Sequence, residues 1–222
     1  MTGLVEAATS ILSSTERRLE VISANVANIA TPGYKRQVTA FETLFSGGKD
    51  PLERLQLQVA VDSGQGKLAE TGNPFDLAIS GAGQFQLRDG DRLIFTRQGQ
   101  FRRAEDGTLV SPAGHVLQQS GGGDLVVGAG AVEIATDGTV LESGVPGPRI
   151  ALFAAAEGSG EMEETGAATL RQGMVEGSNV EAGAEMVAMM GAMRHAESGA
   201  RLIQLYDQLV GKAISDLGQV AR

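Results

Sequence analysis

An α+β fold is predicted by the way hydrophobic periodicity changes along the 222-residue sequence. Apolar residues recur every seven residues near both ends of the chain, which is typical of long helices that pack along one side. Between about residues 70 and 170 the period shortens to two, and Gly, Pro and Asp-Gly pairs separate short apolar groups. We therefore expect a discontinuous helical domain, built from coiled-coil-like helices at both termini, and a compact central antiparallel β domain.

The first helix is expected over residues 3–29, within an N-terminal segment of residues 1–36. Its two apolar columns are Val5, Leu12, Leu19, Val26 and Ala8, Thr15, Ile22, Ile29. The helix should end at Thr31-Pro32-Gly33, because proline restricts the residue before it and glycine permits a turn. Residues 37–70 follow as a connector that we expect to be extended and partly helical.

The β domain is expected over residues 71–170, where many short strands at roughly ten-residue spacing favour a compact antiparallel arrangement. Strands are predicted at 76–79, 84–87, 93–96, 100–102, 108–110, 116–117, 125–127, 132–134, 139–141 and 150–153. Turns are predicted at 81–83, 89–90, 106–107, 112–114, 137–138 and 146–148. The acidic tract 157–166 is expected to be a solvated loop or a sheet edge.

The last segment, residues 171–222, is predicted to complete the inner helical domain. Ser178 or Asn179 is a suitable N-cap for a helix that starts near residue 180. The apolar columns of this helix are Ala182, Met189, Ala196, Ile203, Val210, Leu217 and Met186, Met193, Ala200, Asp207, Ile214. Asp207 is the one position that does not fit the pattern.

Composition excludes several classes of function. The chain has no cysteine, which removes disulfides, thiol nucleophiles and cysteine-ligated metals. Both terminal segments are nearly neutral, so most of the net charge of −9 belongs to the middle, and no basic stripe is available for nucleic acid. No apolar run approaches the length of a membrane-spanning helix, and the start lacks the pattern of a cleavable secretory signal.

Catalysis and metal binding have little basis in the sequence. The two histidines are His115, in a Pro-Ala-Gly turn, and His195, in the C-terminal helix, and no nucleophile-elbow motif is present. The Asp106-Gly and Asp137-Gly turns lack the alternating carboxylates of a calcium loop. We therefore predict a protein that is not an enzyme and that has no cofactor, no metal site and no small-molecule substrate.

The stretch from Ala24 to Arg36, ANVANIATPGYKR, is the most specific local pattern. Asn25 and Asn28 are three residues apart near the expected helix end, where their amides could bond neighbouring helices or the last open carbonyls. Read alone, the stretch is a helix stop followed by a turn. It also resembles the N-terminal motif of the bacterial flagellar rod and hook family, typified by Asn-x-x-Asn-x-x-Thr-x-Gly-[Phe/Tyr]-Lys.

Two further segments are similar to motifs of the same family. Residues 73–85, followed by 95–101 and 106–115, resemble its central β motif. Residues 172–180 and the helix after them resemble its C-terminal motif. The three motifs stand in the family's order and cover most of the chain. The short length disfavours a hook subunit. The segment 73–79, NPFDLAI, and the compact centre look most like the proximal rod member, with the distal rod member as the near competitor.

The resemblance implies a structural subunit of the flagellar basal-body rod. Such a subunit polymerises through its terminal helices into the axial drive shaft that transmits torque to the hook. The implied partners are other rod proteins, further copies of the chain and the flagellar type III export apparatus. The implied location is the rod, which spans the periplasm and is reached without a cleaved signal peptide. The alternatives are a distal rod or hook-type subunit, or a self-contained binding module or enzyme whose two helices pair within one chain.

The residues expected at the subunit interface come from the two seams and from the asparagines between them. They are Val5, Leu12, Leu19, Ile22, Asn25, Val26, Asn28, Ile29, Met186, Met189, Met193, Ile203, Val210 and Leu217. The crowded methionines favour an interface, because unbranched and polarizable side chains adapt to several different neighbours.

Overall fold

The computed structural model describes residues 2–43, 55–156 and 160–220. The chain divides into two compact units. The helical unit contains Met1–Ala27, Arg36–Asp62 and Val180–Arg222, and the β unit contains Asn28–Lys35 and Ser63–Asn179. Two terminal helices and a central set of antiparallel strands confirm the α+β class predicted from periodicity.

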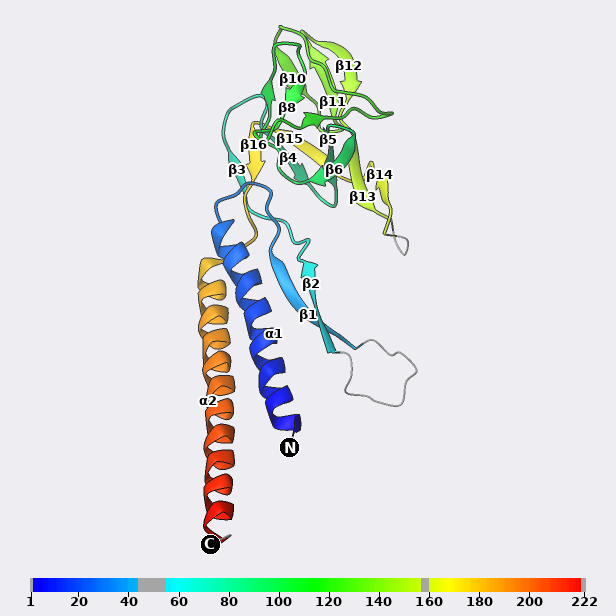
Figure 1. Ribbon diagram of the computed structural model, residues 1–222. Helices are drawn as coiled ribbons and strands as arrows, with labels where there is room; N and C mark the ends of the chain where they lie inside the picture. Colours follow the sequence, from blue (N-terminus) through cyan, green and yellow to red (C-terminus); the bar gives the residue numbers. More distant parts are fainter. Residues whose placement is uncertain (1, 44–54, 157–159, 221–222) are drawn as a thin grey trace. The chain divides into compact units, whose positions relative to one another are not determined.

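In the helical unit, α1 (Thr2–Ala27) and α2 (Ala182–Val220) lie side by side and run in opposite directions (Figure 1). The buried side of α1 is the column Ala8, Thr15, Ile22, as the spacing predicts. Ile29, the last member of that column, lies beyond the end of α1 and is 37% exposed. The two helices thus pair within the chain.

The first column predicted for α2 is correct from Met189 to Val210, although Ala182 is exposed, and the second column is wrong. Met189, Ala196, Ile203 and Val210 are half-buried, whereas Met186 and Met193 are 63% and 51% exposed. The positions one residue earlier are buried or half-buried instead: Glu185, Ala192, Gly199 and Tyr206. A search for apolar residues misses this column because it contains a carboxylate and a glycine. Gly199 is required by close packing, since a Cβ there would lie 3.2 Å from Leu12 Cδ2.

A two-stranded antiparallel sheet completes the helical unit. β1 (Gln37–Thr43) pairs with β2 (Leu55–Val61), in a register that runs from Gln37 opposite Val61 to Thr43 opposite Leu55. The predicted connector over residues 37–70 therefore contains paired strands and extended chain where it is described, rather than partial helix. Residues 44–54 of that connector lie outside the described residues.

The β unit is built from short strands, and every described strand pair in it is antiparallel (Figure 1). The largest sheet has the order β14-β13-β5-β9-β8-β7, and β6 pairs with β5. Its strands are β5 (Gln84–Asp89), β6 (Arg92–Thr96), β7 (Arg102–Arg103), β8 (Leu109–Val110), β9 (Val116–Leu117), β13 (Leu152–Ala155) and β14 (Met162–Glu164). The smaller sheets contain β3 (Leu68–Glu70), β4 (Leu77–Ser80), β10 (Val132–Ile134), β11 (Thr139–Glu142), β12 (Val145–Arg149), β15 (Thr169–Gln172) and β16 (Met174–Glu176).

One apolar core holds these strands together. Phe85 and Phe101 meet edge to face at its centre, with ring centroids 5.5 Å apart. The fully buried aliphatic side chains around them include Leu77, Ile79, Leu87, Leu109, Leu117, Leu125, Ile150 and Leu170. Alternation along β5, which buries Phe85 and Leu87 and leaves Gln86 and Arg88 half-buried, is the period-two pattern seen in the sequence.

Three details of the predicted secondary structure are wrong. Residues 125–127 form no strand: Val126 makes an isolated bridge to Thr108, next to the bridge between Asp124 and Gln118. The predicted turn at 146–148 lies in β12, an edge strand where prolines are tolerated because one side needs no N–H donor. The start of α2 is Ala182, so Glu181 occupies its N-cap position and Ser178 and Asn179 lie further upstream.

Candidate subunit interface and two buried carboxylates

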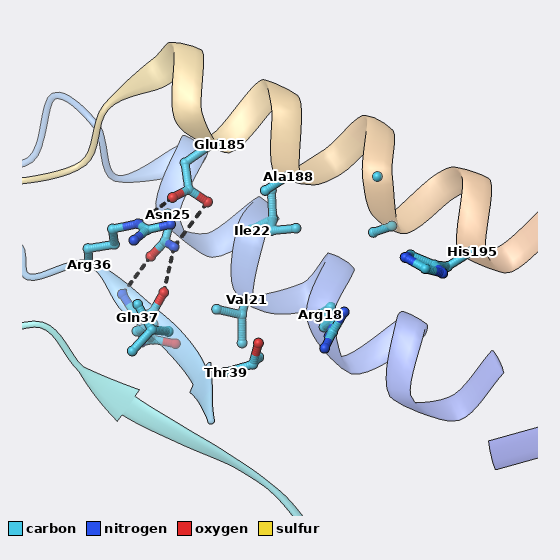
Figure 2. A pocket seen from close by; sticks show the side chains of 13 residues that line it. Arg18, Val21, Ile22, Asn25, Arg36, Gln37, Thr39, Glu185, Ala188 and His195 are labelled. Atoms are coloured by element: carbon cyan, nitrogen blue, oxygen red, sulfur yellow. Dashed lines mark hydrogen bonds and ion pairs between the residues drawn. The ribbon is translucent and has the colours of Figure 1, made fainter. Parts of the chain in front are cut away.

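Asn25, the first asparagine of the motif, is 1% exposed and joins α1 to the start of β1. Its Nδ2 donates to the Gln37 carbonyl at 2.8 Å, and its Oδ1 accepts from the Gln37 N–H at 2.8 Å. The side-chain amide thus pairs with one residue of backbone as a neighbouring strand would. Figure 2 shows both bonds. This pairing fixes where the chain enters the hairpin after the turn.

Glu185 lies at the same place, in the first turn of α2, and is fully buried. Its Oε1 accepts from Arg36 Nε at 2.5 Å, and its Oε2 accepts from Asn25 Nδ2 at 3.2 Å. A buried carboxylate is tolerated only when it is paired and hydrogen-bonded. Arg36, with a side chain 33% exposed, supplies the charge, and Asn25 satisfies the second oxygen. The cluster therefore joins both helices and β1.

A pocket of about 400 Å³ opens beside this cluster, between α1, β1 and α2 (Figure 2). Val21 and Ile22 line it from α1, and Ala188, Gly191 and Ala192 line it from α2. Its charged or titratable lining groups are Arg18, Arg36, Glu185 and His195. Glu185 and Arg36 form an ion pair within this lining.

The β unit holds a second buried carboxylate, Glu176, at the end of β16. Its Oε1 accepts from Lys35 Nζ at 2.6 Å and from the Gly66 N–H at 2.8 Å. Its Oε2 accepts from Arg97 Nη1 at 3.1 Å, and Arg97 is itself only 7% exposed. The ion pair between Lys35 and Glu176 therefore holds the segment 28–35 against the strands of the β unit, and Arg97 binds the same carboxylate.

Gly33 of the motif lies in the same segment and has no room for a side chain. Its φ is +71°, and a Cβ there would lie 2.3 Å from the Gln98 nitrogen. Its N–H donates to the Glu176 carbonyl at 2.7 Å. Asn28, the second asparagine, lies after the end of α1 and accepts from the Thr31 hydroxyl at 3.1 Å. The motif is thus explained by contacts within the chain.

The outward side of α2 carries an unusual number of large apolar side chains. The exposed members are Met186, Val187, Met190, Met193, Leu202, Leu205 and Leu209, with exposed fractions between 37% and 67%. The exposed described residues of α1 before Val26 are polar, namely Thr9, Ser10, Ser13, Glu16, Arg17, Glu20 and Ser23. So many large apolar side chains exposed along one helix favour an interaction site, so α2 is the candidate subunit interface.

The predicted interface residues fall into separate groups in the structure. Ile22 and Asn25 are buried within the helical unit, and Met189, Ile203 and Val210 are half-buried there. Leu12 and Leu19 line a second, more open depression with Ala196. Val26, Ile29, Met186 and Met193 are exposed. Val5 and Leu217 lie outside the residues whose side chains are described. Sequence reasoning missed Val187, Leu202, Leu205 and Leu209, which lie between the columns it followed, whereas Met190 was among the crowded methionines expected at an interface.

Three turn carboxylates in the β unit have lowered pKa values. A hydrogen bond from the Thr108 hydroxyl lowers the pKa of Asp106, and a backbone N–H bond from Thr139 lowers that of Asp137. The pKa of Asp124 is lowered by a bidentate hydrogen bond from Arg88, with N–O distances of 2.9 and 2.6 Å, and by Gln118. These carboxylates stabilise Asp-Gly hairpin turns and the loop before β10, and they converge on no common point.

Within the residues described, no three His, Asp or Glu side chains gather as metal ligands would. None of the described helices has a stretch sufficiently long and apolar to cross a bilayer.

Comparison with known proteins gives three family matches along the chain. Residues 6–35 match the flagella basal body rod protein family, residues 78–142 match the flagellar hook protein FlgE/F/G D1 domain, and residues 171–216 match the flagellar basal body rod FlgEFG protein C-terminal family. The matches include the motif around Asn25, the core strands of the β unit and most of α2. They define the class as structural proteins of the bacterial flagellum.

The chain belongs to the family of flagellar basal-body rod and hook proteins. It is 30% identical to the flagellar basal-body rod protein FlgF of Mesorhizobium japonicum, over 91% of this chain and 92% of the relative. It is 29% identical to the FlgF of Caulobacter vibrioides, over 92% and 93%. FlgG, the flagellar basal-body rod protein of Bacillus subtilis, is 26% identical over 90% of this chain and 93% of its own length.

Proposed function

We propose that this protein is a structural subunit of the flagellar basal-body rod and that it polymerises through its helical unit. Like its relatives, which are flagellar rod proteins, it is a structural protein and not an enzyme. We infer a proximal position in the rod from the FlgF relatives, which are 28–30% identical to this chain, and the FlgG relatives, at 26–29% identity, make a distal position the alternative. Other rod proteins and further copies of the chain are then its neighbours in the axis, across the periplasm.

The observation that carries this proposal is the outward apolar surface of α2. Leu205 and Leu209 are 55% and 67% exposed, and Met186 is 63% exposed. Burial of such side chains against neighbouring subunits would contribute about 25 cal/mol per Å² of apolar area. The paired helices of one chain would then contact those of its neighbours in a coiled-coil-like inner layer. Export through the flagellar type III apparatus, with no cleaved signal, is part of the same proposal.

A single charge on this surface tests the role in assembly. Leu205→Asp should exclude the chain from the rod, because a carboxylate in an apolar interface cannot be hydrated. The assay is an immunoblot of purified basal bodies from cells whose only copy is the variant, together with swimming motility. Thermal unfolding followed by helical ellipticity should remain near the wild-type value, since Leu205 is outward-facing.

Ser13→Asp is the matched control, because it adds the same charge to the exposed polar side of α1. We expect it to enter basal bodies normally. A wild-type chain that is absent from purified basal bodies would refute the proposed function. Normal incorporation of Leu205→Asp would refute the role of α2 while leaving the rod location intact.

A further inference from the structure

The pair Asp-Gly occurs three times in the chain, at 89–90, 106–107 and 137–138, each time at a turn between strands of the β unit. The backbone nitrogen of the residue after an aspartate can attack the side-chain carboxyl carbon of that aspartate. Glycine in the following position favours this attack, because it has no side chain in the way. The three pairs therefore have the same local chemistry, and only the folded structure can make them react differently.

The carboxylates of two of these aspartates are held in place by hydrogen bonds. Asp106 Oδ1 accepts from the Thr108 N–H at 3.0 Å and from the Thr108 hydroxyl at 2.7 Å. Asp137 Oδ1 accepts from the Thr139 N–H at 3.0 Å, and its Oδ2 accepts from the Thr139 hydroxyl at 3.0 Å. In both turns the carboxyl group must lose two hydrogen bonds before its carbon can approach the backbone nitrogen.

The glycines of the same two turns are also held. The Gly107 N–H donates to the Ala104 carbonyl at 3.1 Å, and the Gly138 N–H donates to the Ala135 carbonyl at 2.9 Å. A Cβ at Gly107 would lie 2.7 Å from the Val127 carbonyl oxygen. The nitrogens that would attack are therefore occupied, and at Gly107 the neighbouring backbone leaves little room for a new ring.

Asp89, the last residue of β5, differs in each of these respects. Its side chain is 58% exposed, and its Oδ1 lies 3.8 Å from His115 Nε2, which is longer than a hydrogen bond. Within the part of the chain that the structure describes, the Asp89 carboxylate accepts no hydrogen bond and the Gly90 N–H donates none. Gly90 is exposed, and a Cβ there would meet no atom within 4 Å.

We propose that Asp89-Gly90 is a site of spontaneous covalent modification, at which aspartate converts to isoaspartate through a succinimide. The Gly90 nitrogen attacks Cγ of the protonated Asp89 carboxyl and a C–N bond forms. One carboxyl oxygen leaves as water, which takes the proton of the carboxyl and the proton of the amide. A water molecule then opens the ring at the main-chain carbonyl carbon of Asp89, so that the chain continues through Cβ and Cγ. The sum is an isomerisation that requires no oxidant, reductant or cofactor.

The product changes the surface of the β unit at one point. A methylene group enters the main chain at the hairpin between β5 and β6, and a free carboxylate is attached directly to Cα. Asp89 opposite Arg92 is the last pair of that hairpin, whereas the core begins in β5 at Leu87. The modified chain should therefore stay folded and present the new carboxylate to solvent. A protein carboxyl methyltransferase that recognises isoaspartate and uses S-adenosylmethionine is the class of enzyme that would act on it.

Peptide mapping of the full-length chain measures the modification. The folded protein is incubated for weeks at neutral pH and digested, and electron-transfer mass spectrometry of the peptides distinguishes isoaspartate from aspartate. We expect isoaspartate at residue 89 in at least about tenfold excess over residues 106 and 137, because two hydrogen bonds must be broken first at each of those positions. A purified isoaspartate methyltransferase with labelled S-adenosylmethionine should place its methyl group at the same residue.

Two controls separate the effect of the fold from that of the local sequence. In concentrated urea the three pairs should isomerise at similar rates, because the turns are lost and glycine follows every one of these aspartates. Asp89→Glu keeps the charge on an exposed side chain but would have to form a larger ring. The folded variant should therefore lose the modification at residue 89 and most of its capacity to accept methyl groups.

Four outcomes would overturn the proposal. They are equal isoaspartate at the three positions of the folded chain, more at 106 or 137 than at 89, none at 89 when the chain in urea forms it there, and unchanged methyl acceptance in Asp89→Glu. The proposed function is decided separately, by the presence of the wild-type chain in basal bodies.

Discussion

Replacing Glu185 by alanine should destabilise the helical unit by about 3 kcal/mol, the lower end of the range for breaking a buried ion pair. The lower end applies because the Arg36 side chain is 33% exposed and can recover part of its hydration, whereas Glu185 is 1% exposed. Asn25 loses one acceptor, but its Nδ2 still donates to the Gln37 carbonyl at 2.8 Å. The lost Asn25 bond therefore contributes about 1 kcal/mol to the destabilisation.

Urea unfolding followed by helical ellipticity measures this loss, because α1 and α2 are the described helices of the chain. Glu181→Ala is the matched control: it removes an exposed carboxylate just before the same helix and should cost under about 1 kcal/mol through the helix dipole. Glu185→Gln should fall between the two, since it keeps an acceptor for Asn25. A loss for Glu185→Ala no larger than that of Glu181→Ala would refute the argument that this cluster joins the helices to β1.

Three further predictions concern the β unit. Gly99→Ala should unfold it or destabilise it by at least about 3 kcal/mol, measured by urea unfolding, because a Cβ there would lie 1.6 Å from the Leu77 carbonyl oxygen. Glu176→Ala should cost about 3 to 5 kcal/mol, since it leaves Lys35 and Arg97 without their carboxylate, and Glu176→Gln should cost less in the same measurement. The β unit should also lose stability in acid: the pKa of Asp124 is lowered below its ordinary 3.8, so its contribution is present above that pH and is lost as pH falls through the folded value. Asp124→Asn should therefore lower the melting temperature at neutral pH and flatten its dependence on pH below about 4.

The elements that follow a regular apolar period could be predicted from the sequence. The column Ala8, Thr15, Ile22 lies on the buried side of α1, and β5 alternates as its pattern requires. The Asp-Gly turn at 106–107 is also correct, because Gly107 adopts a φ of +87° and Asp106 accepts from the Thr108 N–H. In these elements the local residue preferences and the burial pattern agree. The sequence of a single strand or helix is therefore sufficient to predict which of its sides is buried.

The polar contacts could not be predicted in the same way. Glu176 and Glu185 are charged residues in a sequence that gives no local reason to bury them. Their partners, Lys35 and Arg36, precede them by about 140 and 150 residues, so only the folded chain brings them together. The second column of α2 was misplaced for a related reason, because Glu185 and Gly199 occupy buried positions that an apolar pattern assigns to neighbours.

The adjacency of Lys35 and Arg36 has a structural consequence that neither residue has alone. Lys35 belongs to the β unit and pairs there with Glu176, whereas Arg36 belongs to the helical unit and pairs there with Glu185. Each carboxylate lies in the C-terminal part of the chain, nine residues from the other in sequence. An ion pair therefore joins the N-terminal and C-terminal segments of the chain once within each unit. The two cations that form these pairs are adjacent in sequence.

These two ion pairs help a subunit built from both chain ends to keep a defined surface. The interface proposed for α2 depends on a fixed register between α1 and α2, because packing against α1 determines which side of α2 is left exposed. The Asn25, Arg36 and Glu185 cluster sets that register at the end of α1, and Gly199 against Leu12 sets it further along. Loosening the cluster should thus release the end of α1 from α2 before α2 itself unfolds. Glu185→Ala is consequently expected to speed amide hydrogen exchange near the end of α1 at temperatures at which the helical ellipticity of the chain is still intact.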